Sequence, residues 1–169
     1  MQDFVHLHVH TQYSLLDGQA SVARLVDKAM QNGMKGIAVT DHGNMFGIKE
    51  FTNYVNKKNS GPKGEIKDLK KRLVGIEAGS IECEDKEAEV AACKAKIVEA
   101  ENKLFKPIIG CEMYVARRTM DLKEGKQDQS GYHLIVLAKN ETGYHNLIKL
   151  VSHAWTRGYY MRPRTDRSN

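Results

Sequence analysis

Apolar and polar residues alternate along residues 4–10, and a helical spacing follows. Val5, Leu7 and Val9 would share one face of an extended strand, and three histidines would share the other face. Over residues 20–33 the apolar positions instead recur every three or four residues. Ser21, near the start of this stretch, can cap the helix, and Gly33 at its end can stop it. We therefore expect a strand followed by a helix.

The same order of strand and helix continues along the chain. Residues 36–40 form a short apolar run typical of a buried strand, and residues 45–56 predict a second helix. Further strands are expected over 106–116 and 132–140, and the last of them leads into a helix over 141–158. This alternation predicts an α/β fold with a parallel sheet or barrel. Four strands are too few to close a barrel, so we expect the chain to be a fragment.

Two polar stretches interrupt this order. Residues 57–103 are rich in Lys and Glu, and their apolar positions recur at helical spacing in two runs. They predict two amphipathic helices joined near the EAGS sequence at 77–80. We interpret this segment as a charged helical hairpin inserted within one domain that spans 1–169; the alternative is a partner-binding arm. Residues 117–131 predict a mobile polar loop.

Composition narrows the class of protein. With 28% charged and 41% hydrophobic residues, the 169-residue chain is typical of a globular domain. Its longest apolar runs are too short to span a bilayer, so no membrane partner is expected. Three scattered cysteines without a Cys-x-x-Cys pair favour reduced thiols in the cytoplasm. The net charge of +5 permits an anionic partner, such as nucleic acid or a phosphate ester, without establishing one.

Two histidines of the first predicted strand are candidate metal ligands. His8 and His10 are two residues apart, so their Cα atoms would lie roughly 6.5 Å apart with both side chains on one face. Neutral imidazoles placed in this way can bind one divalent ion or two adjacent ions. The alternative is a pair of polar side chains that are satisfied by hydrogen bonds at a strand end.

Four other segments also present a His, Asp or Glu beside a predicted strand. The carboxyl ends of barrel strands are where active sites are built, so these side chains are expected to converge. A mixed set of imidazoles and carboxylates suits a multinuclear site, in which a carboxylate bridges two ions and water is activated to attack phosphorus. The full set comprises His8, His10, Asp17, Asp41, His42, Glu112 and His133.

A basic and aromatic cluster lies near the end of the chain. It consists of Arg157, Arg162 and Arg164, with Tyr159 and Tyr160 between them. Such a cluster can contact a nucleic-acid backbone, and it can equally tether the domain to a neighbouring domain. Trp155, on the preceding helix, is predicted to be a core residue.

Five stretches carry a resemblance to a known family. They are HLHVHTQYSLLDG, AVTDHGNMFG, KPIIGCEMYVA, YHLIVLAKNETGYHNLIKLVS and GYYMRPR. Together they resemble the polymerase-and-histidinol-phosphatase (PHP) domain at the N-terminus of the alpha subunit of bacterial DNA polymerase III. The resemblance covers about 1–56 and 104–164 but not 57–103. It implies a distorted barrel of seven βα units, here incomplete, with up to three metal ions at the carboxyl ends of its strands.

The resemblance also implies a role for each matching residue. Glu112 would bridge two metals, Asp41 would assist catalysis, and His6 would lie beside the site without binding a metal. The family also uses a cysteine or histidine and an Asp-x-His pair from later strands, which this chain does not contain. Part of the site is therefore expected to be missing. The implied metal ligands are His8, His10, Asp17, His42, Glu112 and His133.

The activity that the resemblance implies has two levels. The domain would be a metal-dependent phosphoesterase with Zn, Mn or Fe, in some relatives a proofreading 3′–5′ exonuclease. The parent protein would be a cytoplasmic DNA polymerase, a nucleotidyltransferase that uses Mg and binds DNA, with replisome subunits as partners. Its fingers, palm and thumb regions are absent, so the chain alone should not extend primers. The alternatives are a phosphatase of the histidinol-phosphatase type and a non-catalytic scaffold stabilised by metal.

Overall fold

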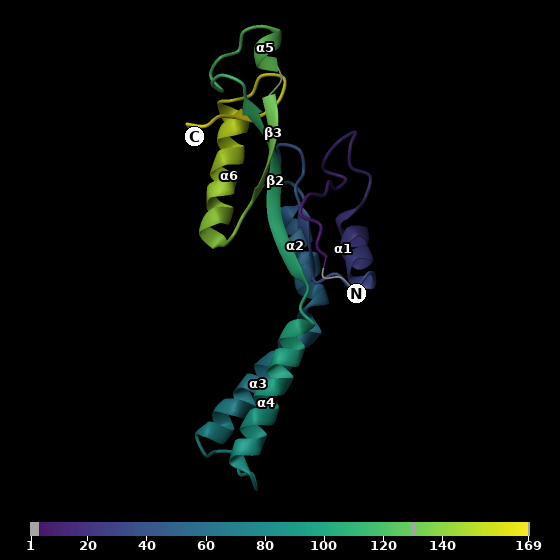
Figure 1. The fold of residues 1–169 in the computed structure, drawn as a ribbon, viewed down its shortest axis with the longest axis vertical. Helices are drawn as coiled ribbons and strands as arrows, with labels where there is room; N and C mark the ends of the chain where they lie inside the picture. The colour runs from purple at the N-terminus through teal and green to yellow at the C-terminus, as the bar shows by residue number, and fades with distance from the viewer. Residues whose placement is uncertain (1–3, 130, 169) are drawn as a thin grey trace. The chain divides into compact units, whose positions relative to one another are not determined.

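The computed structural model describes residues 4–129 and 131–168, and the chain forms two compact units. Unit 1 consists of Met1–Tyr54 and Pro107–Asn169, and unit 2 consists of Val55–Lys106. The elements, drawn in Figure 1, are α1 (Val22–Gln31), β1 (Gly36–Val39), α2 (Ile48–Lys58), α3 (Ser60–Glu77), α4 (Lys86–Asn102), β2 (Lys106–Ala116), α5 (Lys126–Gln129), β3 (Gly131–Leu137), α6 (Glu141–Thr156) and β4 (Arg164–Thr165). Among the described residues, no helix has the length and apolar character needed to cross a membrane.

The sheet of unit 1 is mixed, with β2 at its centre. β3 pairs with β2 in antiparallel register, from Gly110 opposite Leu137 to Ala116 opposite Gly131. β4 pairs with β2 in parallel, and a parallel bridge joins His42, just after β1, to Glu112. The expected parallel pairing is therefore present between β2 and both β4 and the segment after β1, but not between β2 and β3. The connection from β2 to β3 holds only the four-residue helix α5, which is too short for the crossover that parallel strands require.

The strand predicted over residues 4–10 is not formed as a regular strand. The backbone N–H of Ala38 donates to the His6 carbonyl at 2.8 Å, and that of Thr40 donates to the Val9 carbonyl at 2.9 Å. Two residues separate the donors but three separate the acceptors, so a regular ladder cannot form. Leu7, on the apolar face of the predicted strand, is 52% exposed. The segment instead runs beside β1 as an irregular extended chain.

Helices cover the sheet of unit 1 with apolar side chains. α1 packs against β1, and Val22 and Val26 on its apolar face are fully buried, as its apolar spacing predicts. α6 covers β2, and their buried contact residues are Cys111, Met113, Leu147 and Ala154. Because side chains alternate along a strand, Glu112 and Tyr114 point to the face of β2 opposite Cys111 and Met113. This alternation places the acidic side chain away from the α6 core.

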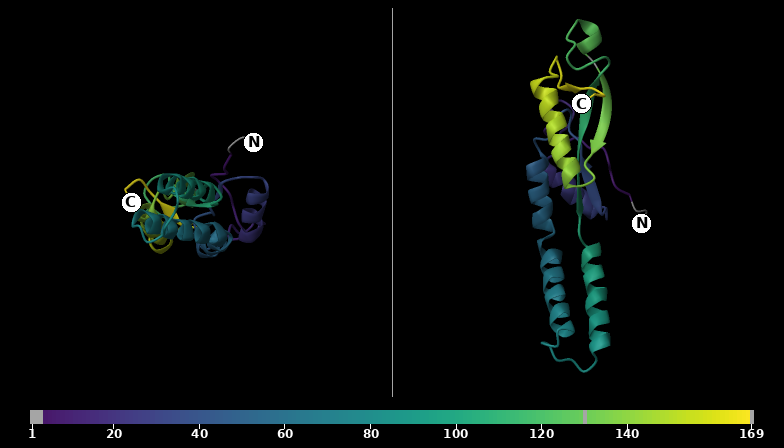
Figure 2. Two further views of the ribbon diagram at one scale, coloured as in Figure 1. Left: turned by 90° about the horizontal axis from the view of Figure 1, so that it is seen from below. Right: turned by 90° about the vertical axis from the view of Figure 1, so that its left-hand side faces the viewer.

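Unit 2 contains the two long helices predicted between residues 57 and 103. α3 and α4 pack side by side as an antiparallel pair (Figure 2), and Asp85 caps α4 by accepting from the Ala88 N–H at 3.0 Å. Buried Asn59 and Phe105 join the chain segments at the base of the pair. The Asn59 side chain donates to the Phe105 carbonyl at 2.8 Å and accepts from its N–H at 2.9 Å.

Candidate metal centre

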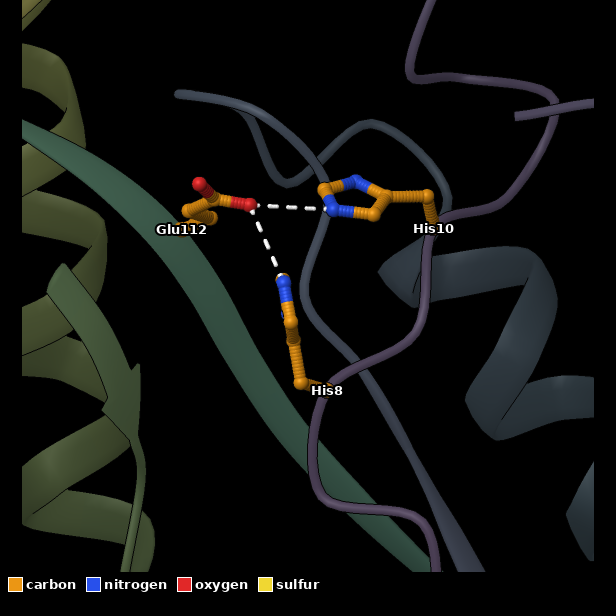
Figure 3. Close-up of side chains that lie close together, drawn as sticks. All are labelled: His8, His10 and Glu112. Carbon is orange, nitrogen blue, oxygen red and sulfur yellow. Dashed lines mark ion pairs between the residues drawn. The ribbon is translucent and has the colours of Figure 1, made fainter. Parts of the chain in front are cut away.

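Imidazoles surround the carboxylate of Glu112, which is only 4% exposed. The Nε2 atoms of His8 and His10 lie 3.4 and 3.0 Å from its Oε2 atom (Figure 3). The Nδ1 atom of His42 lies 3.4 Å from the same oxygen, and Nδ1 of His133 is hydrogen-bonded to Oε1. Four histidines from three separate chain segments therefore meet at one buried carboxylate.

Each element brings its histidine to Glu112 for an identifiable reason. His42 lies three residues after the end of β1, and its parallel bridge to Glu112 aligns the two residues. On β3, His133 lies opposite Tyr114, which places it diagonally across from Glu112 on the same face of the antiparallel pair. His8 and His10 reach the site from the irregular segment beside β1.

Hydroxyl groups hold the rings of His8 and His10. The Thr40 hydroxyl lies 2.9 Å from Nδ1 of His8, and the Ser14 hydroxyl lies 2.9 Å from Nδ1 of His10. Thr40 donates its own proton to the Val9 carbonyl, and Ser14 donates its proton to Asp41. Each hydroxyl can therefore only accept from its histidine, so both rings carry a proton on Nδ1. A ring that carries its single proton on Nδ1 directs an unprotonated Nε2 atom at Glu112, which is the arrangement that metal-binding histidines adopt.

Asp41 lies beside the site but is fully engaged with protein donors. It is 1% exposed and accepts from the Thr11 N–H at 2.6 Å, the Thr11 hydroxyl at 2.8 Å and the Ser14 hydroxyl at 2.7 Å. The Ser14 oxygen also accepts from the backbone N–H of His42 at 3.1 Å. Asp41 therefore acts through Ser14 as a positioning residue for His10 and His42.

The donor atoms around Glu112 fit a bound cation. Its Oε2 atom and Nδ1 of His42 are buried, and neither makes a hydrogen bond to any described residue. Leaving such atoms unpaired is costly, and a metal ion would satisfy both. Two groups of side chains, each with ligand atoms within 4.8 Å of one another, could hold an ion, and both include Glu112. They are His8, His10 and Glu112, and His42, Glu112 and His133.

The ionisation of Glu112 agrees with this fit. Burial raises the pKa of its carboxyl, but the hydrogen bond from His133 and the nearby His42 lower it, and the net pKa lies below the ordinary value. The ionised carboxylate is the form that binds metal. The neighbouring Cys111 points into the α6 core, where burial raises the pKa of its thiol to about 12. Cys111 therefore packs as a neutral thiol.

Two predicted residues occupy different positions around the centre. The Asp17 carboxylate lies 3.1 Å from Nε2 of His42 and is 62% exposed, so it lies at the open edge of the site. The His6 ring instead packs edge-on against Phe4, and the His6 carbonyl accepts from the Ala38 N–H. His6 thus contributes to the alignment of its segment with β1.

The predicted nucleic-acid contact by Arg164 is wrong. Its side chain is 1% exposed and donates to four backbone carbonyls, those of Met120, Leu122, Asp128 and Gly158. These bonds tie β4 to residues 117–129, which were expected to be mobile but contain α5. Arg157 is exposed but paired with Asp121, with its Nε atom 2.7 Å from the carboxylate. Arg162 is exposed and lies over the Tyr114 ring.

Sequence reasoning missed three side chains that shape the site. Tyr114 stacks on His42, with ring centroids 5.8 Å apart, and meets His133 edge-on at 4.9 Å. Strand alternation gave a usable signal, because Tyr114 is two residues after Glu112 and shares its face. Ser14 and Thr40 carried no such signal, because their contacts with His10 and His8 depend on how distant segments pack.

The chain matches the model of the PHP domain family over residues 6–98 and 83–169. It is 38% identical over 169 residues to the DNA polymerase III subunit alpha of Borreliella burgdorferi, covering 98% of this chain and 11% of that protein. Its identity with the protein of the same name from Treponema pallidum is 40% over 164 residues, covering 96% of this chain and 10% of that protein. The chain thus spans about a tenth of the length of the curated relatives that it matches.

Proposed function

The chain belongs to the PHP domain family, and from this premise we propose that it is the metal-dependent phosphoesterase domain of a replicative DNA polymerase subunit. Its substrate would be the phosphodiester at the 3′ end of a DNA strand. The observation that carries the proposal is the buried Glu112 carboxylate, which two groups of histidine ligands share. A carboxylate in this position suits a pair of adjacent cations.

The side chains of the centre would have distinct roles. His8 and His10 would hold one ion with Glu112, and His42 and His133 would hold a second ion with the same carboxylate. Zn, Mn or Fe are the ions of choice, because imidazole suits transition metals. Divalent ions bound there would lower the pKa of water and neutralise the oxygens of a phosphate group. Asp17, at the open edge, would orient His42 through its 3.1 Å contact with Nε2.

The activity of the longer protein is part of the proposal. The names of the relatives support a DNA-templated nucleotidyltransferase that uses Mg and works in the cytoplasm with DNA and other replisome subunits. We assign nucleotide addition to regions outside these residues, and residues 57–103 to a helical hairpin inserted in the domain. The chain alone should show no primer extension, and robust extension would contradict this division of labour.

The test compares hydrolysis by matched histidine variants. A single-stranded oligonucleotide labelled at its 5′ end is incubated with this chain extended to the full barrel and with Mn²⁺ or Zn²⁺, and the release of 3′ nucleotides is followed on a gel. His10→Ala should reduce the rate by on the order of 100-fold or more, because a ligand is lost. His145→Ala is the control, since this exposed side chain lies on α6 with Glu141 as its partner and should change nothing.

Two results would contradict the proposal. Tight metal binding without any nucleotide release, with His10→Ala lowering only thermal stability, would favour a metal-stabilised scaffold. Release of phosphate from histidinol phosphate, but no nucleotide release from DNA, would favour the phosphatase alternative.

A further inference from the structure

An open groove of about 550 Å³ adjoins the metal centre in unit 1. His42 and Tyr114 line it and also take part in the centre, so the two sites are continuous. Its volume lies within the range of roughly 300–1,000 Å³ that is usual for small-ligand sites. The groove is therefore large enough for part of a ligand whose reacting end lies at Glu112.

Three aromatic rings line the groove and keep much of their surface exposed. Trp155 and Tyr159 are stacked, with centroids 5.7 Å apart and planes 22° apart, and Phe46 lies 6.2 Å from Trp155. Their exposed fractions are 42% for Trp155, 48% for Tyr159 and 65% for Phe46. The prediction that Trp155 is a core residue is therefore wrong. Its indole N–H donates to the Gly43 carbonyl at 2.7 Å, which fixes the ring in its orientation.

The charged groups of the groove favour an anionic occupant. Arg162 lines it, with its guanidinium 4.9 Å from the centroid of Tyr114 and a 2.8 Å hydrogen bond to the Tyr114 hydroxyl. None of the described residues that line the groove is acidic. An occupant with flat aromatic faces and negative charge would match both the exposed rings and the guanidinium.

We propose that this groove binds an unpaired nucleobase of a single-stranded nucleic acid, which stacks on the Trp155 and Tyr159 rings. The backbone phosphate beside that base contacts Arg162. Aromatic rings bind bases of any sequence in this way, because every base has a π face. The inference deepens the proposed function and rests on it for the identity of the polymer, but it assigns a binding site that works without metal.

The only tryptophan of the chain supplies the probe for this site. The fluorescence of Trp155 is titrated with an eight-nucleotide oligothymidylate in the presence of a chelator. Stacking should quench the emission, and an abasic oligonucleotide of the same length should bind about 10-fold more weakly or worse. Equal affinity for the abasic strand, or the absence of quenching, would overturn the inference.

Matched variants locate the binding site. Tyr159→Leu and Arg162→Gln should each weaken binding of the oligothymidylate by about 10-fold. Tyr132→Leu is the control, because this tyrosine on β3 is also exposed, at 63%, but does not line the groove. Equal losses in Tyr159→Leu and Tyr132→Leu would overturn the inference, as would an acidic peptide that displaces the oligonucleotide with higher affinity.

The result can be separated from the test of the proposed function. Quenching in the presence of chelator without any nucleotide release in metal would retain the stacking site and reject the phosphoesterase. Nucleotide release at an unchanged rate in Tyr159→Leu, without any quenching of Trp155, would retain the phosphoesterase and reject the stacking site.

Discussion

Two neighbouring regions of unit 1 each bury a carboxylate, but the groups that surround the two carboxylates differ. Residues Asp41 and Glu112 are 1% and 4% exposed, and the backbone N–H of Glu112 donates to the Asp41 carbonyl at 3.0 Å. Around Asp41, hydroxyl and amide donors satisfy both oxygens. Around Glu112, ring nitrogens that are not fixed as donors crowd one oxygen, which makes no hydrogen bond to a described residue.

The difference shows that burial of a carboxylate does not by itself indicate its role. A buried carboxylate with a full set of protein donors stabilises the fold, since its charge is compensated within the chain. A buried carboxylate whose neighbours are imidazole nitrogens of ligand type could instead hold a cation. The hydrogen-bond partners of the carboxylate, and not its degree of burial, distinguish the positioning residue Asp41 from the candidate ligand Glu112.

The largest expected effect is on the stability of the metal-free protein. Asp41→Asn places an amide N–H₂ among donors that need an acceptor, so it should lower the free energy of unfolding by about 2–4 kcal/mol. Glu112→Gln should lower it by at most about 1 kcal/mol, because His133 is its one hydrogen-bond partner among the described side chains and the Gln carbonyl can still accept that bond. Urea denaturation with chelator measures both, and equal losses would remove the distinction between the two regions.

Metal affinity should depend strongly on Glu112, although the stability of the metal-free protein depends on it only weakly. Glu112→Gln removes the charge shared by both ligand groups, so the affinity for Zn²⁺ or Mn²⁺ should fall by about 100-fold. Isothermal titration calorimetry measures this change, with His145→Gln on α6 as a control outside the centre. An affinity unchanged by Glu112→Gln would mean that the carboxylate is not a ligand.

The hydroxyl groups that hold the imidazoles sharpen the comparison further. Thr40→Val removes the partner of His8, and Ser14→Ala removes the partner of His10; each should lower metal affinity by about 10-fold. Ser14→Ala should also cost about 1 kcal/mol of stability, because Asp41 loses a donor. Serine in place of Thr40 keeps the hydroxyl and should restore the affinity; failure to do so would show that packing, not the hydrogen bond, holds His8.

The smallest expected effect is a dependence on pH. The pKa of Glu112 lies below its ordinary value of 4.5, so ionised Glu112 contributes stability above that pH. This contribution should disappear as the pH falls below about 4.5 and through the lower folded-state pKa. Unfolding curves of the wild type and Glu112→Gln, recorded in chelator, should therefore converge in acid. Curves that diverge as the pH falls would place the folded-state pKa above the ordinary value.

Local patterns in the sequence were sufficient to find the residues that meet at Glu112. His42 and Glu112 lie on or after strands whose apolar runs are unambiguous, and His8 and His10 keep a common side even though their segment is irregular. The irregular pairing of residues 4–10 with β1 could not be predicted. It depends on the hydrogen bond that the Val9 N–H donates to the Thr40 hydroxyl instead of to a backbone carbonyl. The antiparallel direction of β3 likewise depends on the whole connection before it.

The arginines show why burial was the weakest part of the sequence analysis. Arg162 and Arg164 are two residues apart in one basic run, yet the first is exposed and the second is 1% exposed. The carbonyls that bind Arg164 include those of Met120 and Asp128, more than thirty residues earlier. A local pattern contains no information about such distant partners, so both residues looked equally available to nucleic acid.

Whether residues 57–103 are an insertion in the family stays a prediction.

The most direct test of the central claim is the anomalous-difference density of crystals soaked in Zn²⁺ at neutral pH. We predict peaks about 2.0–2.2 Å from Glu112 oxygens, one with His8 and His10 as ligands and one with His42 and His133. Density without any peak at Glu112, with its carboxylate hydrogen-bonded only to protonated histidines, would contradict the claim that this buried carboxylate is a metal ligand.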